Sequence, residues 1–198
     1  MSHVTHDKEA MAKRIKKYIY TFALLGGCTC LFWGFWIPAK ATLAQILLQR
    51  AWTLSLETKK PVKPWPWADS WPIGRLRQYR LGVDLIILEG ASGEALAFGP
   101  GRLEGSGRPG GENHSIFAGH RDTSFAFLKE VQRGDKLRIE SLSGQDTYTI
   151  ESTKIIPAAE LYLDKERPHT LSLITCYPFE TILPQTQLRY LVTAIMDY

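Results

Sequence analysis

The chain has 198 residues, 44% of them hydrophobic and 22% charged, which is enough for one domain of ordinary size with an additional segment. This balance excludes a disordered or collagen-like chain. The formal net charge of +4 at pH 7 raises the question of nucleic-acid binding. Residues 65–198, however, contain 14 basic and 17 acidic residues, so the part expected to fold is mildly acidic. The charge distribution therefore argues against a nucleic-acid partner.

Basic residues flank an apolar segment near the N-terminus. Residues 18–39 (YIYTFALLGGCTCLFWGFWIPA) contain no charged side chain. A helix of that length spans roughly 33 Å, which is enough to cross a bilayer. The preceding residues 1–17 form a tail with five Lys or Arg and two acidic residues. By the positive-inside rule, this tail is predicted to stay in the cytoplasm and the chain after Pro38 to lie outside, so residues 18–39 are predicted to be a transmembrane signal anchor.

Other interpretations of the apolar segment fit its sequence less well. A cleaved secretory signal has a shorter apolar core and a small-residue cleavage site, whereas this segment ends in Trp33, Phe35 and Trp36. The tetrapeptide Leu25–Cys28 looks like a bacterial lipoprotein cleavage box, but cleavage there would leave an N-terminus that is still apolar. A buried core helix that is apolar on all sides would be unusual in so small a chain.

Residues 40–64 are predicted to be a linker in two parts. In the first, Leu43, Leu47 and Leu54 recur at helical spacing, which predicts a short amphipathic helix against the membrane or the domain. In the second, the prolines between Lys59 and Pro72 predict a stiff, extended spacer. We therefore expect the folded domain to occupy residues 65–198.

Within residues 65–198 the pattern changes to short strands with Gly-containing turns, which is typical of a mostly β domain. The only predicted helices are short, at residues 125–131 and 158–163, and residues 143–146 are predicted to turn a β-hairpin. About eight strands in a domain of this length favour a closed eight-stranded β-barrel, which leaves few exposed edges. The predicted strands are residues 75–77, 85–88, 95–98, 115–118, 136–139, 148–151, 171–174 and 190–193.

Cys176 is the strongest candidate for a nucleophile. The other cysteines, Cys28 and Cys30, lie in the predicted membrane helix, so Cys176 has no partner for a structural disulfide in the exported domain. A lone thiol in an oxidising compartment is either buried and inert or used in chemistry. Cys176 follows an apolar strand, and an antiparallel partner strand would bring Arg189 beside it. A guanidinium there can hydrogen-bond an oxyanion, although Arg189 taken alone reads as a surface charge.

His120 is the candidate acid/base. It follows the predicted strand 115–118, and Gly119 allows the chain to turn there and present the imidazole at the rim of the barrel. A cysteine and a histidine that are close in space form a nucleophile and acid/base pair even when they are far apart in sequence. His114 lies in a Gly-rich loop and His169 follows Pro168, so both are predicted to be solvated loop residues.

Three short segments, which contain His120, Cys176 and Arg189 in chain order, resemble the signature sequences of sortases. Residues 171–178 (LSLITCYP) resemble the TLxTC signature, with Thr175 and Cys176 intact and Ser172 differing in detail. Residues 117–123 (FAGHRDT) resemble the family's histidine motif, and residues 188–190 (LRY) resemble its arginine strand. The similarity covers roughly residues 73–198 and is greatest to class D and E sortases and their proteobacterial relatives, class GN.

The resemblance implies an eight-stranded sortase barrel with cysteine transpeptidase activity. Cys176 would attack a carbonyl in an LPxTG-like sorting motif near the C-terminus of a secreted protein, and an amine acceptor on the cell envelope would release the acyl-enzyme. His120 would protonate the leaving amine, and Arg189 would stabilise the oxyanion. Thr175 and Tyr177 are expected to contact the substrate, and the enzyme would be held in the cell inner membrane.

No cofactor is expected, and the scattered acidic residues predict no metal site. Two rival interpretations remain. A papain-like or L,D-transpeptidase-like cysteine enzyme is one, although the Ser-x-Gly-Cys motif of the latter is absent. The other is a membrane-anchored β-domain without catalytic activity, such as an adhesin or an assembly module, in which Cys176 would be unreactive.

Overall fold

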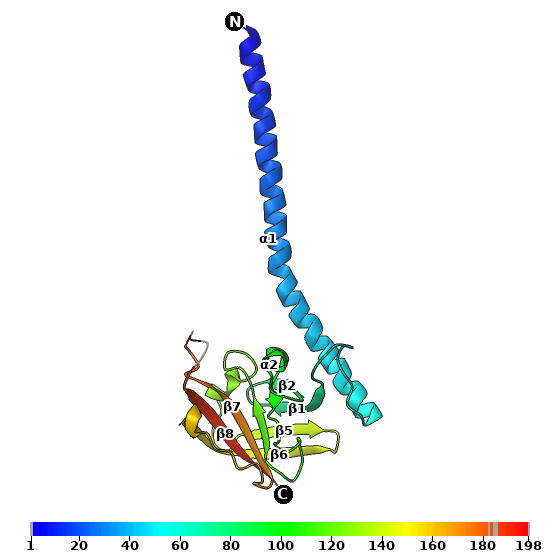
Figure 1. Cartoon of the computed structure of the whole chain (residues 1–198), viewed down its shortest axis with the longest axis vertical. Coiled ribbons are helices and arrows are strands. Elements are labelled where there is room, and N and C mark those ends of the chain that lie inside the picture. Colours follow the sequence, from blue (N-terminus) through cyan, green and yellow to red (C-terminus); the bar gives the residue numbers. More distant parts are fainter. Residues whose placement is uncertain (1, 182, 184–185, 198) are drawn as a thin grey trace. The chain divides into compact units, whose positions relative to one another are not determined.

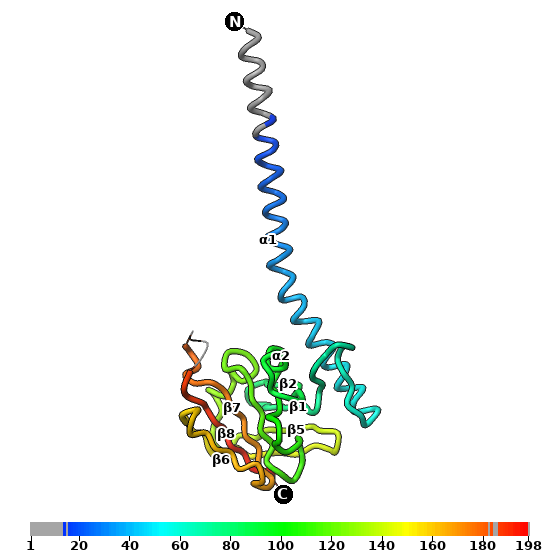
Figure 2. The backbone as a smooth tube through the Cα atoms, viewed as in Figure 1, coloured from blue at the N-terminus to red at the C-terminus, as the bar shows by residue number. Residues whose placement is uncertain are grey.

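The structure, a computed structural model, describes residues 2–181, 183 and 186–197, with only the backbone of residues 2–13 and 15. The chain divides into two compact units, Met1–Leu43 and Ala44–Tyr198. Helix α1 (Ser2–Thr58) forms the described part of the first unit and continues into the second. Figures 1 and 2 follow the chain from this helix through the strands.

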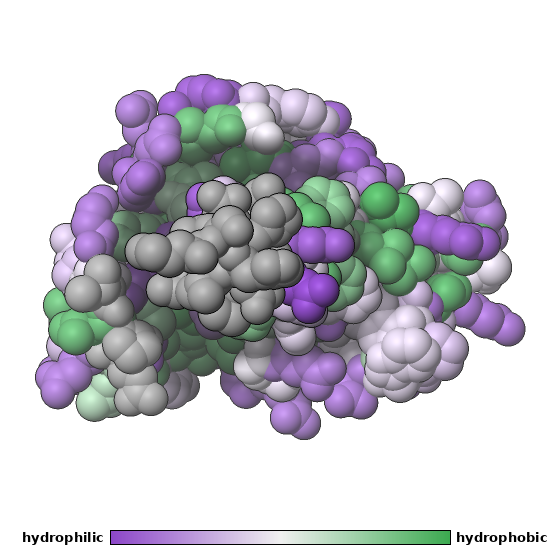
Figure 3. Space-filling model, turned by 90° about the horizontal axis from the view of Figure 1, so that it is seen from above, coloured by the Kyte–Doolittle hydropathy of each residue, from purple (hydrophilic) through white to green (hydrophobic). Residues whose placement is uncertain are grey.

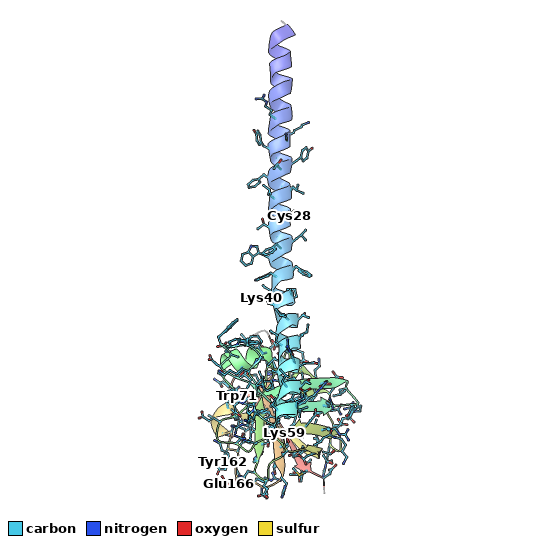
Figure 4. The ribbon with its side chains drawn as sticks, turned by 90° about the vertical axis from the view of Figure 1, so that its right-hand side faces the viewer. Cys28, Lys40, Lys59, Trp71, Tyr162 and Glu166 are labelled. Carbon is cyan, nitrogen blue, oxygen red and sulfur yellow. The ribbon has the colours of Figure 1, made fainter. Side chains whose placement is uncertain are left out.

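The first unit exposes apolar side chains along α1. Phe22 is 82% exposed and Phe35 75% exposed, and Cys28 lies on the same stretch of helix (Figure 4). The helix is long and apolar enough over this stretch to cross a membrane. The structure therefore contains one candidate membrane span in its described part, at the position that the sequence predicted.

The second unit is a closed eight-stranded barrel with the strand order β1-β2-β3-β4-β7-β8-β6-β5. This confirms the predicted fold class. The strands β4 and β7 are parallel and β7 and β8 antiparallel (Figure 1). The strands are β1 (Pro72–Gln78), β2 (Val83–Leu88), β3 (Gly101–Arg102), β4 (Ser115–Ala118), β5 (Lys136–Ser141), β6 (Gln145–Pro157), β7 (Thr170–Tyr177) and β8 (Leu188–Met196).

The barrel interior is filled by alternate residues of the strands, because successive side chains of a strand point to opposite faces. Leu76, Leu137 and Ile150 pack there with Leu171 and Leu173. Along the outline of the molecule in Figure 3, most side chains are hydrophilic, with some hydrophobic ones between them. The hairpin between β5 and β6 is confirmed, with the amide of Ser141 donating to the carbonyl of Gly144 at 2.7 Å.

The barrel unit begins earlier in the chain than the expected Trp65. Leu48 and Trp52, on the last turns of α1, are each 1% exposed and pack with Leu88 of the barrel. The hydroxyl of Ser55 accepts a hydrogen bond from the amide of Val62 at 3.0 Å, which directs the chain back after the helix. Residues 44–58, the C-terminal part of α1, therefore belong to the folded unit.

One predicted strand is wrong. Residues 95–98 belong to helix α2 (Gly93–Phe98), because the hydroxyl of Ser92 caps the first turn by accepting from the amide of Ala95 at 3.2 Å. The strand that occupies this place in the barrel is β3, two residues long, which the sequence pattern did not reveal. The predicted short helices are 3-10 turns, η1 (Ala126–Lys129) and η2 (Ala158–Glu160).

Candidate active site

Strand β7 brings the three candidate catalytic residues to one end of the barrel. Cys176 is paired directly with Arg189 of β8 in the antiparallel register. On the other side of β7, Ala118 of β4 pairs in parallel with Ile174. Because side chains alternate along a strand, Cys176 lies on the same face as Ile174, and the chain after Ala118 carries His120 to that end of the sheet. Figure 2 shows β7 and β8 side by side.

The three side chains differ in exposure and support. Cys176 is a free thiol and is half-buried, as is Arg189, whereas His120 is exposed. The Nη1 of Arg189 donates to the backbone carbonyls of Thr186 at 2.6 Å and Leu188 at 2.9 Å. These bonds hold the guanidinium at the start of β8, opposite the thiol-bearing position of β7.

The turn that carries His120 is tightly packed. The amide of Gly119 donates to the carbonyl of Ile174 at 3.1 Å, and the amide of Phe125 donates to the carbonyl of His120 at 2.9 Å. A Cβ at position 119 would lie 2.8 Å from the buried Phe125 ring, so only glycine fits here without a shift. The close approach fixes the backbone from which the imidazole projects.

Thr175 supports this turn instead of facing outward. Its side chain is 2% exposed, and its hydroxyl donates to the carbonyl of Gly119 at 2.8 Å. Thr175 and Tyr177 alternate with Cys176 and so belong to the opposite face of β7. The Tyr177 ring stacks on Tyr190, with centroids 6.1 Å apart, and meets Phe179 edge-on. This placement is at odds with direct substrate contact through the Thr175 hydroxyl.

Arg121 is a residue whose part in the site was missed from the sequence. Its Nη2 donates to the carbonyl of Thr181 at 3.0 Å and to that of Leu183, both in the connection between β7 and β8. Arg121, the residue after His120, therefore holds the segment that follows Cys176 through hydrogen bonds to its backbone. A cation next to a candidate catalytic residue was the available signal, but its acceptors are backbone carbonyls about sixty residues away, which no local pattern specifies.

The prediction that His114 is a solvated loop residue is wrong. The side chain is 3% exposed; Nδ1 lies 2.6 Å from the carbonyl oxygen of Asp164 and Nε2 2.8 Å from the hydroxyl of Ser172. Burial lowers the pKa of His114 below its ordinary value, although the hydrogen bond to Asp164 opposes this shift. His169 is half-buried, so it is not fully solvated either.

An apolar cluster covers the outer face of the sheet next to the candidate site. Ile116 of β4, Ile174 of β7 and Leu191 of β8 are buried there outside the barrel interior. Leu161 and Leu163, from the connection between β6 and β7, pack on them. This face leads along β7 directly to Cys176. In the part of the chain that the structure describes, no group of three or more His, Cys, Asp or Glu residues could hold a metal ion.

The thiol of Cys176 is half-buried at the end of β7, Arg189 lies opposite it on β8, and His120 follows the neighbouring strand β4. In a closed β-barrel, these are the candidate groups of a cysteine enzyme with a histidine acid/base. The family model described as Sortase domain matches residues 78–197. The chain belongs to the sortase family, as the sequence motifs indicated.

Individual relatives agree with this assignment. The chain is 34% identical over 112 residues to Sortase D of Bacillus subtilis (strain 168), a match that covers 55% of this chain and 56% of that protein. The chain thus spans about half the length of the curated relative it matches.

Among solved structures, the complex of Streptococcus agalactiae sortase C1 with MTSET is similar at 29% identity and a TM-score of 0.55, covering 64% of this chain and 69% of that one. A Clostridium perfringens Sortase D5 transpeptidase has a TM-score of 0.62 and covers 79% of this chain and 99% of its own. At 18% identity, the latter likeness shows the fold alone.

Proposed function

We propose that this sortase is a membrane-anchored cysteine transpeptidase that cleaves a C-terminal, LPxTG-like sorting motif of a secreted protein and transfers the product to an amine. The observation that carries the proposal is the direct pairing of Cys176 with Arg189 between β7 and β8. His120 follows β4, which is the other neighbour of β7 in the barrel. Membership of the sortase family supports the reaction class.

In the first half-reaction, the Cys176 thiolate attacks the carbonyl carbon of the scissile peptide bond. The carbonyl electrons move onto oxygen, and the Arg189 guanidinium, held by two backbone carbonyls at the start of β8, hydrogen-bonds this oxyanion. When the tetrahedral intermediate collapses, the C–N bond breaks and His120 gives its proton to the leaving amine. A thioester to Cys176 and a free amine remain.

In the second half-reaction, an amine acceptor attacks the thioester and His120 takes its proton. The C–S bond breaks and Cys176 leaves as the thiolate. Cys176 must be ionised while His120 is protonated for the first step, so the reactive form carries the thiolate–imidazolium pair.

The apolar outer face supports a peptide substrate with an aliphatic residue in its motif. The cluster of Ile116, Ile174 and Leu191 continues from Cys176 along the same face of the sheet. A substrate side chain that packs against Leu161 and Leu163, which cover this cluster and are only partly buried, places a carbonyl further along the chain beside the thiol. Burying a leucine there contributes about 1.5–3 kcal/mol of binding.

The N-terminal helix supports an anchoring role. Its exposed apolar stretch and the basic residues before it support a single-pass anchor with residues 1–17 in the cytoplasm and the barrel on the extracytoplasmic side of the inner membrane. The substrate is then a protein that has crossed the same membrane.

Replacing the nucleophile tests the proposal. Cys176→Ala is expected to abolish cleavage of an LPETG-containing fluorogenic peptide and covalent labelling of the exported domain by a thiol reagent, while circular dichroism stays unchanged. Cys176→Ser keeps the size of the side chain and serves as the matched control for packing. Peptide cleavage that persists in Cys176→Ala would rule out the mechanism, and an unreactive Cys176 in the wild type would favour a non-catalytic β-domain.

A further inference from the structure

Two long connections of the barrel are tied together beside the outer face. The β3–β4 connection, residues 103–114, meets the β6–β7 connection, residues 158–169. The backbone amide of His114 donates to the carbonyl of Lys165 at 3.3 Å, and the amide of His169 donates to that of Glu112 at 2.7 Å. The ammonium of Lys165 reaches back to the carbonyl of Glu104 at 3.0 Å.

The His114 side chain sits at the centre of these ties. Because the carbonyl of Asp164 can only accept, Nδ1 carries the proton and donates across 2.6 Å. In the neutral ring Nε2 then accepts from the Ser172 hydroxyl at 2.8 Å. The imidazole is thus bonded to the β6–β7 connection on one side and to β7 itself on the other, four positions before Cys176 on the same face of the strand.

The β6–β7 connection reaches the candidate site through its apolar residues. Leu161 and Leu163 pack on the outer-face cluster that includes Ile174, the neighbour of Cys176 on that face. Asp164 follows Leu163 directly in the chain. Its carboxylate accepts a hydrogen bond from the amide of Glu166 at 3.0 Å, which shapes the turn. Tyr162, which is 85% exposed, and Glu166 extend from the connection into solvent (Figure 4).

We propose that His114 is a positioning residue that holds the β6–β7 connection against the outer face and thereby shapes the place where the aliphatic part of the peptide substrate binds. This inference rests on the proposed function for its substrate. The tie itself consists only of contacts within the chain. His114 touches neither Cys176 nor the reacting carbonyl in this scheme, so its effect falls on substrate binding.

The tie weakens in acid. A protonated ring donates at both nitrogens, so Nε2 no longer accepts from Ser172, and the buried site gains a charge. The charged groups that act on the imidazole lie on the β6–β7 connection: Arg167 opposes its protonation and Asp164 favours it, while burial has the largest effect and lowers the pKa. Below the ordinary histidine pKa of about 6.5, the connection is therefore held less firmly as the pH falls.

Three variants separate the functions of the ring. His114→Phe keeps the volume and removes both hydrogen bonds. His114→Asn places an amide nitrogen near the position of Nδ1, so it preserves the bond to Asp164 without a titrating group. Glu166→Gln removes a charge from the same connection without touching the tie and is the matched control.

The first measurement is hydrogen exchange of the full chain in detergent micelles. In His114→Phe at pH 7.5, the amides of residues 158–169 are expected to exchange about tenfold faster than in the wild type, as a lost buried hydrogen bond predicts. The amides of β5 and all amides in Glu166→Gln keep their wild-type rates. Lowering the pH to 5.5 is expected to reduce the protection of residues 158–169, corrected for intrinsic exchange, in the wild type but not in His114→Asn.

The second measurement is cleavage of the LPETG peptide. His114→Phe is expected to raise KM about tenfold with kcat within about twofold of wild type, and His114→Asn, which keeps the bond to Asp164 but not the one to Ser172, is expected to raise KM less than His114→Phe does. Wild-type protection of residues 158–169 in His114→Phe, or a fall in kcat with KM unchanged, would overturn the proposal. If His114→Phe does not fold, equal acid dependence of exchange in wild type and His114→Asn overturns it. Absence of peptide turnover in the wild type contradicts the proposed function instead, while the exchange data still decide the role of His114.

Discussion

At the scale of single residues, the site depends on where strand registers place ordinary side chains. Cys176 and Arg189 are separated in sequence but directly paired between β7 and β8. The Arg189 guanidinium is held by backbone carbonyls, so its orientation does not depend on a carboxylate partner. In Arg189, Nη1 makes both carbonyl bonds and leaves the other nitrogens of the planar fork for an oxyanion, whereas a lysine has a single nitrogen for all of these bonds.

Arg189→Lys is accordingly expected to lose most activity. We expect kcat for the LPETG peptide to fall about 100-fold or more, the size of effect seen when one oxyanion donor is removed, with KM changed little. Steady-state kinetics with purified protein measures both constants, and thermal unfolding controls for folding. Turnover near that of the wild type would make Arg189 a structural residue.

At the scale of elements, the short turns between strands carry the critical geometry. Gly119 connects β4 to His120 and lies against the buried Phe125 ring. The sequence indicated a sharp turn at this glycine, but the reason for the glycine, the approach of an aromatic ring from a later turn, is visible only in the fold. Helix α2 shows the converse case, in which a local Ser92 cap decides the structure against the apolar pattern of residues 95–98.

Gly119→Ala is expected to destabilise the domain by about 1–3 kcal/mol, because the added methyl group overlaps the Phe125 ring and forces a shift. The measurement is the free energy of unfolding from urea denaturation. Gly93→Ala is the matched control: its site has open space, and alanine in a helix is neutral or slightly stabilising. Equal stability of the two variants would contradict the role assigned to Gly119.

At the scale of the whole molecule, the end of α1 belongs to the barrel unit. Trp52 and Leu48 bury their side chains against barrel residues, so the domain boundary falls near Ala44. A chain that lacks residues 1–43 is expected to unfold at a higher temperature than one that lacks residues 1–64, because removing these two side chains costs about 3–5 kcal/mol or more. Calorimetry of both truncated chains tests the boundary, and equal unfolding temperatures would return it to Trp65.

An ion pair at the surface, between Arg80 and Asp135, is expected to make the stability of the barrel depend on pH in acid. The guanidinium of Arg80 lies 2.6 Å from the carboxylate of Asp135 and lowers its pKa, and the amide of Gln132 adds to the effect. A carboxyl group with a lower pKa in the folded state stabilises the fold above its unfolded pKa of about 4, and this contribution disappears as the pH falls through the folded value.

The free energy of unfolding should therefore decrease as the pH falls below about 4, and less steeply in Asp135→Asn than in the wild type. Arg80→Met should flatten the dependence in the same way, because it removes the same interaction from the other side. Urea unfolding at several pH values between about 5 and 2 measures this slope. Identical slopes in all three proteins would show that the pair does not contribute.

The sequence alone determined the class of this protein, because the relevant signals are local. An uncharged apolar segment, alternating strands and three short motifs are each contained within one continuous stretch of residues, so the candidate membrane helix, the barrel and the candidates Cys176, His120 and Arg189 followed from them. Only the tertiary structure decided how these candidates are supported. The bonds of Arg121 to Thr181 and of His114 to Asp164 end on backbone carbonyls 60 and 50 residues away, which every residue possesses, so no sequence pattern distinguishes these acceptors. The Ser172 hydroxyl, 58 residues from His114, comes within reach of the ring only because β4 and β7 pair in the barrel.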